Sequence, residues 1–266
     1  MTTSDQGLAV TGVKPLAGQW AMITGASKGI GYGIAKELVG AGANAVLVAR
    51  GKEALEAAGR DLSEHGDPAQ SVVTVAADTA DREAIADLFR TVRADLPGLN
   101  IMVANAGSGA VVPFLDLTIE EWDRTLALNL TGTFLCCQEA ARMMAQGPAE
   151  ANKAIVVVSS IRGLGIRPGL AAYAATKAGV NQLVRMAAYE LAPLGIRVNA
   201  LSPGITATPL SLDNNPEIFE RRIKDVPLGR AGTPADMAGA ALYLCSTAAA
   251  FVTGMNLVVD GGESLW

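Results

Sequence analysis

Short apolar runs alternate with longer amphipathic stretches along the chain from Trp20 onward. The apolar runs are rich in Val, Ile and Ala and are bounded by turn residues, so each one predicts a buried strand. They occupy residues 21–24, 45–49, 72–76, 101–104, 155–159, 197–201 and 257–259. The longer stretches have the apolar period of helices and occupy residues 30–40, 52–64, 82–95, 119–145, 172–191 and 234–245.

Strands that alternate with helices predict right-handed βαβ crossovers and therefore a parallel sheet. We expect an α/β fold, a single-domain Rossmann-type doubly wound parallel sheet of about seven strands with helices on both faces. Half of the residues are hydrophobic and only 5% are aromatic, which suits strands buried on both faces. We assign residues 18–266 to a single domain and residues 1–17 to a poorly ordered N-terminal extension.

The charge balance and the reactive residue types exclude several classes of function. A net charge of −5 without a cluster of Lys or Arg argues against a nucleic acid or an anionic membrane as partner. The single histidine, His65, lies in a predicted solvated turn, so we expect no metal site and no histidine-based triad. The three cysteines Cys136, Cys137 and Cys245 predict buried core thiols.

One uncharged stretch, residues 237–259, is long enough to cross a membrane. Polar residues interrupt it at Ser246-Thr247 and Thr253-Gly254, and β-branched residues follow, so a helix, a turn and a strand explain it better. The N-terminus has no signal-peptide pattern. We therefore expect a soluble cytoplasmic protein without a membrane partner.

A glycine cluster lies between the first predicted strand and the first predicted helix. It reads Thr24-Gly25-Ala26-Ser27-Lys28-Gly29-Ile30-Gly31, with the spacing G-x-x-x-G-x-G. Glycines in this place let the backbone turn tightly and approach a pyrophosphate, which the helix N-terminus attracts. The cluster predicts a dinucleotide site.

The residue after the second strand bears on which dinucleotide binds. NAD-binding proteins commonly place a carboxylate there to hold the ribose 2′-hydroxyl. This strand ends in Val48-Ala49-Arg50, and Lys28 lies inside the glycine loop. Two cations without an opposing acid favour NADP(H) over NAD(H), with ordinary solvation of both side chains as the alternative.

A tyrosine and a lysine four residues apart open the fifth predicted helix. That spacing places Tyr173 and Lys177 on one face of the helix. An ammonium group near a phenol favours the phenolate and so assists a tyrosine acid. Ser160 leaves the sheet at the end of the preceding strand, where its hydroxyl can hydrogen-bond a substrate oxygen. Each residue alone has a structural explanation as a rim, surface or capping residue.

Taken together, these residues resemble the short-chain dehydrogenase/reductase family, in its single-domain branch of carbonyl and 3-oxoacyl reductases. The resemblance covers residues 16–262. The matching positions are Gly25, Gly29, Gly31, Asp78, Asn105, Ala106, Gly107, Asn129, Ser160, Tyr173, Lys177, Pro203, Gly204, Thr206, Thr208 and the segments 230–234 and 260–262. Ala104 departs from the pattern, because many members have an asparagine there.

The resemblance implies a role for each matching residue. Tyr173 would exchange a proton with the substrate oxygen, and Ser160 would orient and polarise the carbonyl. Lys177 would bind the nicotinamide ribose and lower the pKa of Tyr173, and Asn129 would hold a water that relays protons to Lys177. Asp78 would contact adenine, and residues 105–107 with Pro203, Gly204, Thr206 and Thr208 would line the remaining cofactor. We assign Ser27, Lys28, Ile30 and Arg50 to the same cofactor site. The implied activity is interconversion of a ketone or aldehyde and a secondary alcohol with NADP(H).

The connection between the sixth and seventh strands, residues 202–232, is long and weakly periodic, with a short helix expected at 216–224. Such a connection at the carboxyl end of a strand predicts a lid rather than surface padding. Residues 108–112, 161–167 and 210–219 are the expected pocket lining. Arg162 and Arg167 within it can anchor an acidic group, although ordinary solvation is the simpler interpretation.

Substrate identity stays open at this point. The mostly apolar lining favours a small-to-medium apolar ketone, and a 3-oxoacyl thioester, a polyol or a sugar are alternatives. The Pro193-Leu194-Gly195 turn lacks the basic residue expected of a reductase that binds an acyl-carrier protein. A catalytically weak NADP(H)-binding regulatory protein is the alternative from a different class.

The two long central helices also predict self-association. Apolar residues cover more of their surface than one sheet face requires, namely Leu126, Leu130, Phe134, Leu183, Met186 and Leu191. The family resemblance implies pairing of these helices, so we expect a homotetramer or homodimer. Core packing alone is the alternative.

Overall fold

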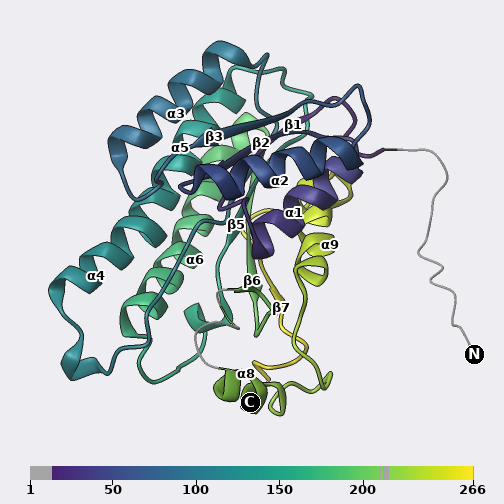
Figure 1. Ribbon diagram of the computed structural model, residues 1–266. Coiled ribbons are helices and arrows are strands. Elements are labelled where there is room, and N and C mark those ends of the chain that lie inside the picture. Colours follow the sequence, from purple (N-terminus) through teal and green to yellow (C-terminus); the bar gives the residue numbers. More distant parts are fainter. Residues whose placement is uncertain (1–13, 210, 212–215, 266) are drawn as a thin grey trace, which may run out of the picture.

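The computed structural model describes residues 14–209, 211 and 216–265 (Figure 1). Seven parallel strands form one sheet in the order β3-β2-β1-β4-β5-β6-β7. Their bounds are β1 Trp20–Thr24, β2 Asn44–Ala49, β3 Val72–Ala76, β4 Ile101–Ala104, β5 Lys153–Val158, β6 Ile196–Pro203 and β7 Asn256–Val259. All seven predicted strands are confirmed, and β5 and β6 begin earlier than the sequence indicated.

The helices also follow the prediction. They are α1 Gly29–Gly40, α2 Lys52–His65, α3 Arg82–Asp95, α4 Ile119–Leu126, α5 Thr133–Ala145, α6 Ala171–Leu191, α8 Pro216–Ile223 and α9 Pro234–Cys245. The predicted helix 119–145 is α4 and α5 joined by a π-helical segment, Ala127–Gly132. The prediction for His65 was wrong in its placement, because this exposed residue closes α2 instead of lying in a loop.

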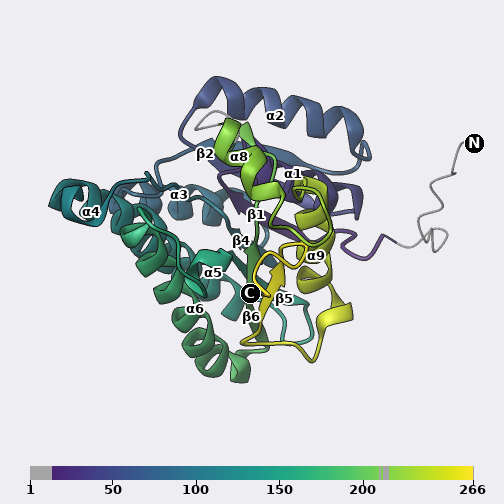
Figure 2. The same cartoon turned by 90° about the horizontal axis from the view of Figure 1, so that it is seen from below.

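Helices cover the sheet on both sides, and each side has its own core (Figure 2). On one side α1, α2 and α9 bury residues such as Leu38, Leu62 and Leu244 against the strands. On the other side α3, α5 and α6 bury residues such as Phe89 and Val184. The three cysteines are buried in these cores as expected, which raises the pKa of Cys136 to about 12 and that of Cys245 to about 12.

The N-terminal segment joins the domain before residue 18. Of the predicted extension 1–17, residues 1–13 lie outside the described residues. Leu16 is fully buried in the core beside α1, and its N–H donates to the Ala41 carbonyl at 3.0 Å. The expectation of a poorly ordered extension was therefore wrong for Leu16, because a buried leucine holds the chain there.

The uncharged stretch 237–259 divides into most of α9, a short 3₁₀ turn at Thr247–Ala249 and β7. Within the part of the chain that the structure describes, no helix has the length and apolarity needed to cross a membrane. The same described part holds no group of three His, Cys, Asp or Glu side chains placed to bind a metal ion.

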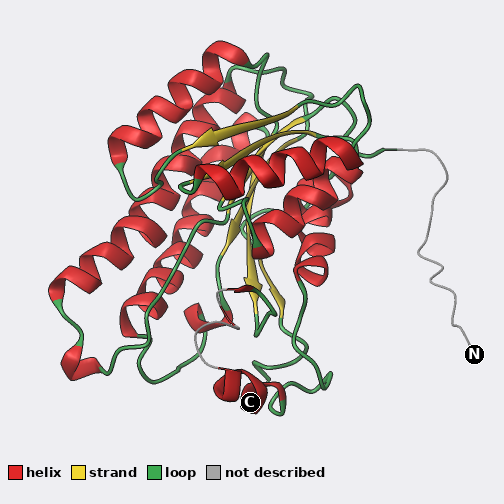
Figure 3. Ribbon diagram, in the orientation of Figure 1, coloured by secondary structure: helices red, strands yellow, loops and turns green. Residues whose placement is uncertain are grey.

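The order of the strands determines where a ligand can enter. The chain runs from β1 outward to β3 and then returns to β4, which pairs with the other side of β1. The loops after β1 and β4 therefore diverge, and in sheets of this type ligands bind at that crevice, outside the carboxyl ends of the strands. The helix α8 lies beyond the arrowheads of β6 and β7 (Figure 3), at the same edge. The predicted short helix in the 202–232 connection is thus confirmed.

The π-helical segment approaches the loop after β3 closely. A Cβ atom added to Gly132 would lie 1.9 Å from the carbonyl oxygen of Thr79, which no side chain tolerates. An extra residue in a helical turn is a frequent feature of functional sites. Here the close approach is possible only because residue 132 has no side chain.

We predict that Gly132→Ala destabilises the protein, because the backbone of Thr79 must move to admit the methyl group. The free energy of unfolding should fall by about 2 kcal/mol or more in urea titrations. Gly239→Ala in α9 is the matched control, since a Cβ there has no heavy atom within 4 Å. That variant should gain about 0.5–1 kcal/mol from lower backbone entropy in the unfolded chain. Equal stability of the two variants would contradict the close packing at Gly132.

Candidate active site

The glycine loop turns directly from β1 into α1. Gly25 and Gly29 have φ angles of +65° and +61°, which only glycine adopts without strain. A Cβ at Gly31 would lie 2.4 Å from both the Gly25 carbonyl oxygen and the Asn105 amide nitrogen. The backbone at Gly31 therefore packs directly against Gly25 and Asn105, and this packing leaves no room for a side chain.

Two polar residues hold this loop against the end of β4. Thr24 Oγ1 accepts hydrogen bonds from the N–H groups of Asn105 at 3.0 Å and Ala106 at 3.1 Å. The Asn105 side-chain amide donates to the carbonyls of Thr24 at 2.9 Å and Gly25 at 3.2 Å. Asn105 thus shapes the cofactor loop, whereas its sequence pattern suggested a direct contact with the cofactor.

The N-terminus of α1 lacks a capping side chain. Its N-cap residue Lys28 makes no side-chain capping bond, and the first turn has no acidic residue. By contrast, the side chains of Asp81 and Thr118 cap α3 and α4. Free N–H groups and the positive end of the helix dipole suit an anion such as a pyrophosphate. Ser27 and Ile30 flank this helix start and are partly exposed.

At the end of β2 the exposed Arg50 lies beside Asp78, with 3.7 Å between the guanidinium and the carboxylate. The other oxygen of Asp78 accepts a hydrogen bond from the Ala80 N–H at 2.9 Å. The sequence argument found no acid opposite Arg50, which was wrong because the loop after β3 brings Asp78 across. An exposed pair of this kind contributes only about 0–1 kcal/mol, so Arg50 can exchange it for another anion.

Tyr173 and Lys177 share one face of α6, as predicted, and the Lys177 ammonium lies 5.6 Å from the centre of the Tyr173 ring. Lys177 is buried and donates to the Val158 carbonyl at the end of β5 at 2.8 Å. Burial lowers the pKa of Lys177 to about 8, since the charged form loses hydration. An ammonium group whose pKa is this close to neutral pH, beside a tyrosine, suits proton transfer.

Burial raises the pKa of Tyr173 above its ordinary value, while the hydrogen bond to Ser160 and the charges of Arg162 and Arg222 oppose this rise. The resemblance implied that Lys177 lowers this pKa. Two arginines that the sequence analysis did not connect with Tyr173 favour the phenolate, and the effect of Lys177 on this pKa stays a prediction. These arginines come from the loop after β5 and from α8.

Ser160 and its neighbour Ser159 have different surroundings. Ser159 donates its hydroxyl to the Asn181 side chain at 2.6 Å, which turns it toward α6. Ser160 Oγ accepts the Arg162 N–H at 3.1 Å and begins a short 3₁₀ turn, Ile161–Gly163. The hydrogen bond of Ser160 lowers the pKa of Tyr173, and the catalytic role of Ser160 stays a prediction.

Asn129 lies fully buried in the π-helical segment. Its amide oxygen accepts the Ser108 N–H at 3.0 Å, and its amide nitrogen donates to the Ser108 carbonyl at 2.7 Å and to Thr176 Oγ1 at 3.3 Å. A Cβ on Gly107 would lie 3.2 Å from this oxygen and 3.5 Å from the Lys177 ammonium nitrogen. Asn129 thus fixes the loop after β4 against Lys177, and its part in a water relay stays a prediction.

The segment after β6 returns to the glycine loop. Pro203 ends the strand, and Thr206 Oγ1 donates to the Gly204 carbonyl at 3.1 Å. A Cβ on Gly29 would lie 3.4 Å from the Thr208 methyl group, so this segment passes over the start of α1. The residues predicted to line a cofactor from two distant parts of the chain are thereby brought together.

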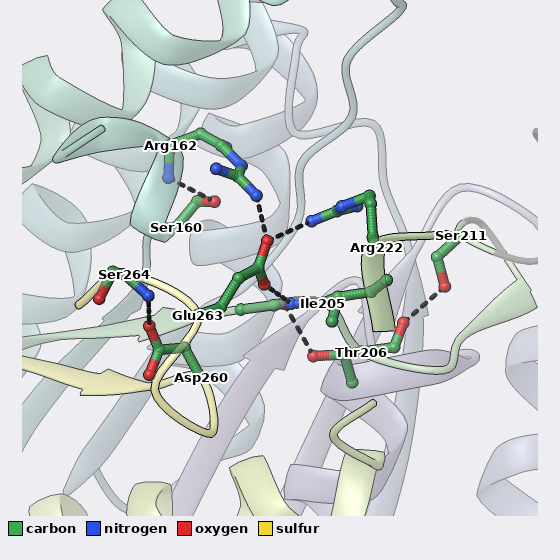
Figure 4. A network of polar contacts seen from close by, with 10 residues as sticks. Ser160, Arg162, Ile205, Thr206, Ser211, Arg222, Asp260, Glu263 and Ser264 are labelled. Carbon is green, nitrogen blue, oxygen red and sulfur yellow. Dashed lines mark hydrogen bonds and ion pairs between the residues drawn. The ribbon is translucent and has the colours of Figure 1, made fainter. Parts of the chain in front are cut away.

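Sequence reasoning missed Glu263 and Arg222 (Figure 4). Glu263 is 6% exposed; one carboxylate oxygen pairs with both Arg162 and Arg222, and the other accepts the Ile205 N–H at 2.6 Å. The one available signal was position, because Glu263 directly follows the 260–262 segment singled out in the sequence. Nothing in the sequence pointed to Arg222, because the sequence does not show whether Arg221 or Arg222 faces the inner side of α8.

A family model described as "Enoyl-(Acyl carrier protein) reductase" matches residues 25–264. The chain belongs to the short-chain dehydrogenase/reductase family. It is therefore an oxidoreductase of this family, which acts on alcohol and ketone types of substrate.

Three family relatives illustrate the range of likeness. Galactitol 2-dehydrogenase (L-tagatose-forming) of Cereibacter sphaeroides is 37% identical, with 94% of this chain and 97% of the relative covered. The 3-oxoacyl-[acyl-carrier-protein] reductase FabG of Aquifex aeolicus is 33% identical, with 93% and 98% covered. A structure from Beutenbergia cavernae, described as an NAD(P)-dependent gluconate 5-dehydrogenase with NADP at low occupancy, has a TM-score of 0.88 at 32% identity and covers 96% of this chain and 100% of that one.

Proposed function

We propose that this protein is an NADP(H)-dependent oxidoreductase that interconverts a ketone or aldehyde and a secondary alcohol, with Tyr173 as general acid and base. The observation that carries the proposal is the convergence of Tyr173, Ser160 and Lys177 at the sheet edge that also holds the glycine loop. A dinucleotide pyrophosphate fits the start of α1, because no side chain caps this helix and the glycines Gly25 and Gly31 leave the loop backbone uncovered.

The bound cofactor supplies or accepts the hydride. The chain's own residues handle the proton: Tyr173 gives it to the substrate oxygen in reduction and takes it back in oxidation. Ser160 hydrogen-bonds the same oxygen as charge develops on it. Lys177, with a pKa of about 8, stays largely protonated at neutral pH and keeps a positive charge beside the phenol. Asn129 holds the loop at Ser108 in place through hydrogen bonds between its side-chain amide and the Ser108 backbone.

Arg50 supports a preference for NADP(H) over NAD(H). It is the exposed cation directly after β2, where the ribose 2′-position of a dinucleotide lies in this fold. Its weak pairing with Asp78 can yield to a 2′-phosphate, and the exposed Lys28 adds a second positive charge. The Beutenbergia cavernae structure carries NADP at low occupancy, which agrees with this preference.

The relatives support small-molecule substrates with hydroxyl or carbonyl groups, including a polyol and a sugar acid. The FabG relative keeps a 3-oxoacyl thioester as the second candidate substrate. We also propose a homodimer or homotetramer, because α5 and α6 expose Phe134 at 40% and Met186 at 49%. The proposed location is the cytoplasm. The filled Tyr173, Ser160 and Lys177 positions disfavour a non-catalytic regulatory protein.

We predict that Tyr173→Phe lowers kcat for NADPH-dependent reduction by about 10²–10⁴-fold, because the proton donor is lost. The substrates are a panel of aliphatic and aryl ketones, keto acids, sugars and an acetoacetyl thioester. Affinity for NADPH, measured by fluorescence titration, should change little. Tyr189→Phe is the matched control, since Tyr189 lies on the same helix and is 84% exposed. Turnover in Tyr173→Phe at the rate of the control would refute the assigned role.

We predict that Arg50→Asp reverses the cofactor preference. The new carboxylate repels a 2′-phosphate and can accept a hydrogen bond from a 2′-hydroxyl. The ratio of kcat/KM for NADPH to that for NADH should fall by at least about 100-fold, or 2.7 kcal/mol at 1.36 kcal/mol per tenfold. Lys36→Asp makes the same charge change at an exposed site on α1 and should leave the ratio within about threefold of the wild type. An unchanged ratio in Arg50→Asp would remove Arg50 from the cofactor site.

A further inference from the structure

Two arginines pair with a single carboxylate, that of Glu263, near Ser160 (Figure 4). A third arginine, Arg167, lies close enough for its charge to interact with theirs. Arg162 follows Ser160 by two residues, Arg222 comes from α8, and both bind the same oxygen of Glu263. The Arg222–Glu263 distance is 3.0 Å, and the Arg222 side chain is only 24% exposed. The cluster therefore links the loop after β5, the helix α8 and the C-terminal segment.

Arg167 adds a third positive charge. Burial lowers its pKa, the charges of Arg222 and Arg162 lower it further, and the charge of Glu263 raises it, so Arg167 interacts electrostatically with all three groups. Among the described residues, Arg167 has no acidic partner within ion-pair distance. The neighbouring acid Asp260 uses its two oxygens for the N–H groups of Gly262 and Ser264. Within the described residues, three arginines thus share one carboxylate, which leaves a positive excess.

This excess includes an unused hydrogen-bond donor. The Nε atom of Arg162 is buried and has no hydrogen-bond partner in the described part of the chain. A buried guanidinium group without its full set of acceptors is unfavourable, because it has lost its hydration. Glu263 does not satisfy the Arg162 Nε donor, because its second oxygen already accepts the Ile205 N–H. An additional anion would complete the cluster.

The position of the cluster identifies which ligand would bring that anion. The Arg162 N–H donates to Ser160 Oγ, the hydroxyl that hydrogen-bonds Tyr173. The charges of Arg162 and Arg222 act on Tyr173 itself. The glycine loop, where a cofactor pyrophosphate fits, is formed instead by the loops after β1 and β4. The cluster therefore faces the reacting end of the substrate.

We propose that the substrate is a keto acid or hydroxy acid, whose carboxylate binds Arg162, Arg167 and Arg222. This inference rests on the proposed function and specifies its substrate class. Glu263 holds Arg162 and Arg222 side by side, and Arg167 supplies the charge that Glu263 leaves unmatched. Because Arg222 belongs to α8, a bound carboxylate also fastens this helix over the site. The sequence-based preference for an apolar ketone, and for solvated loop arginines, is replaced by this proposal.

The test compares acids with uncharged partners of the same shape. The substrates are 4-oxocyclohexanecarboxylate and 3-oxocyclohexanecarboxylate, each beside its carboxamide. For the better acid, the wild type should show kcat/KM at least about tenfold above that for the matching amide, because charge-assisted hydrogen bonds are lost in the amide. Binding of the same compounds to protein loaded with NADP⁺, measured by calorimetry, gives a readout that needs no turnover.

Three variants assign the preference to the cluster. Arg167→Gln should lower the acid-to-amide ratio of kcat/KM by about tenfold without loss of stability, since none of the described acidic residues forms an ion pair with Arg167. Arg162→Gln and Arg222→Gln should lower it as well. Arg221→Gln is the matched control, because Arg221 is the exposed neighbour on α8. It should keep the wild-type ratio.

Two kinds of failure are distinguishable. Equal kcat/KM for each acid and its amide, or no measurable binding of either acid, overturns the substrate proposal even when neutral ketones are reduced. A fall in kcat/KM of Arg222→Gln that is the same for acids and amides also overturns it, and shows a cluster that serves only to fasten α8. Binding of the acids without NADPH oxidation on any carbonyl compound contradicts the proposed function instead.

Discussion

The contact between the glycine loop and Asn105 stands at the point where the order of the strands reverses. The Asn105 amide binds the carbonyls of Thr24 and Gly25, and Thr24 Oγ1 binds the backbone after β4 in return. This reciprocal bonding holds the ends of β1 and β4 together while their loops separate. The loop packs this closely against Asn105 because Gly31 has no Cβ. The start of α1, and with it any phosphate site, is positioned by this contact.

The chemistry at the neighbouring strands depends on burying charge at a fixed place. Lys177 is fastened to the end of β5 through the Val158 carbonyl, and burial lowers its pKa to about 8. Tyr173 lies one turn earlier on α6, where burial raises its pKa and nearby cations oppose that rise. A rigid helix packed on a rigid sheet keeps these groups at a constant separation, which proton transfer requires. The π-helical segment contributes Asn129 from the other side.

Much of this arrangement was predictable because it is encoded locally. The alternation of apolar runs and amphipathic stretches predicted every strand, and the four-residue spacing of Tyr173 and Lys177 predicted their common face. Contacts between distant loops were not predictable in the same way. The pairing of Arg50 with Asp78 depends on how the loop after β3 folds back. Helical periodicity likewise does not encode the π-helical turn or the close approach of Gly132 to Thr79.

The arginine cluster shows the same limit more sharply. Arg162 and Arg167 were visible as charged residues in a predicted pocket loop, and solvation was the simpler explanation for both. Only the fold brings Glu263 and α8 to that loop, and it leaves Arg162 18% exposed rather than solvated. Sequence patterns thus indicate which groups carry the chemistry, while the balance of charge around them follows from three-dimensional packing.

Transfer of deuterium from cofactor to product tests the central claim most directly. NADPH labelled with deuterium at C4 of the nicotinamide, in separate samples for each face, would be incubated with the ketone of the panel that is reduced fastest. Mass spectrometry of the product should show one deuterium on the carbinol carbon from one labelled face and none from the other. An alcohol that is unlabelled in both samples would contradict direct hydride transfer in this site.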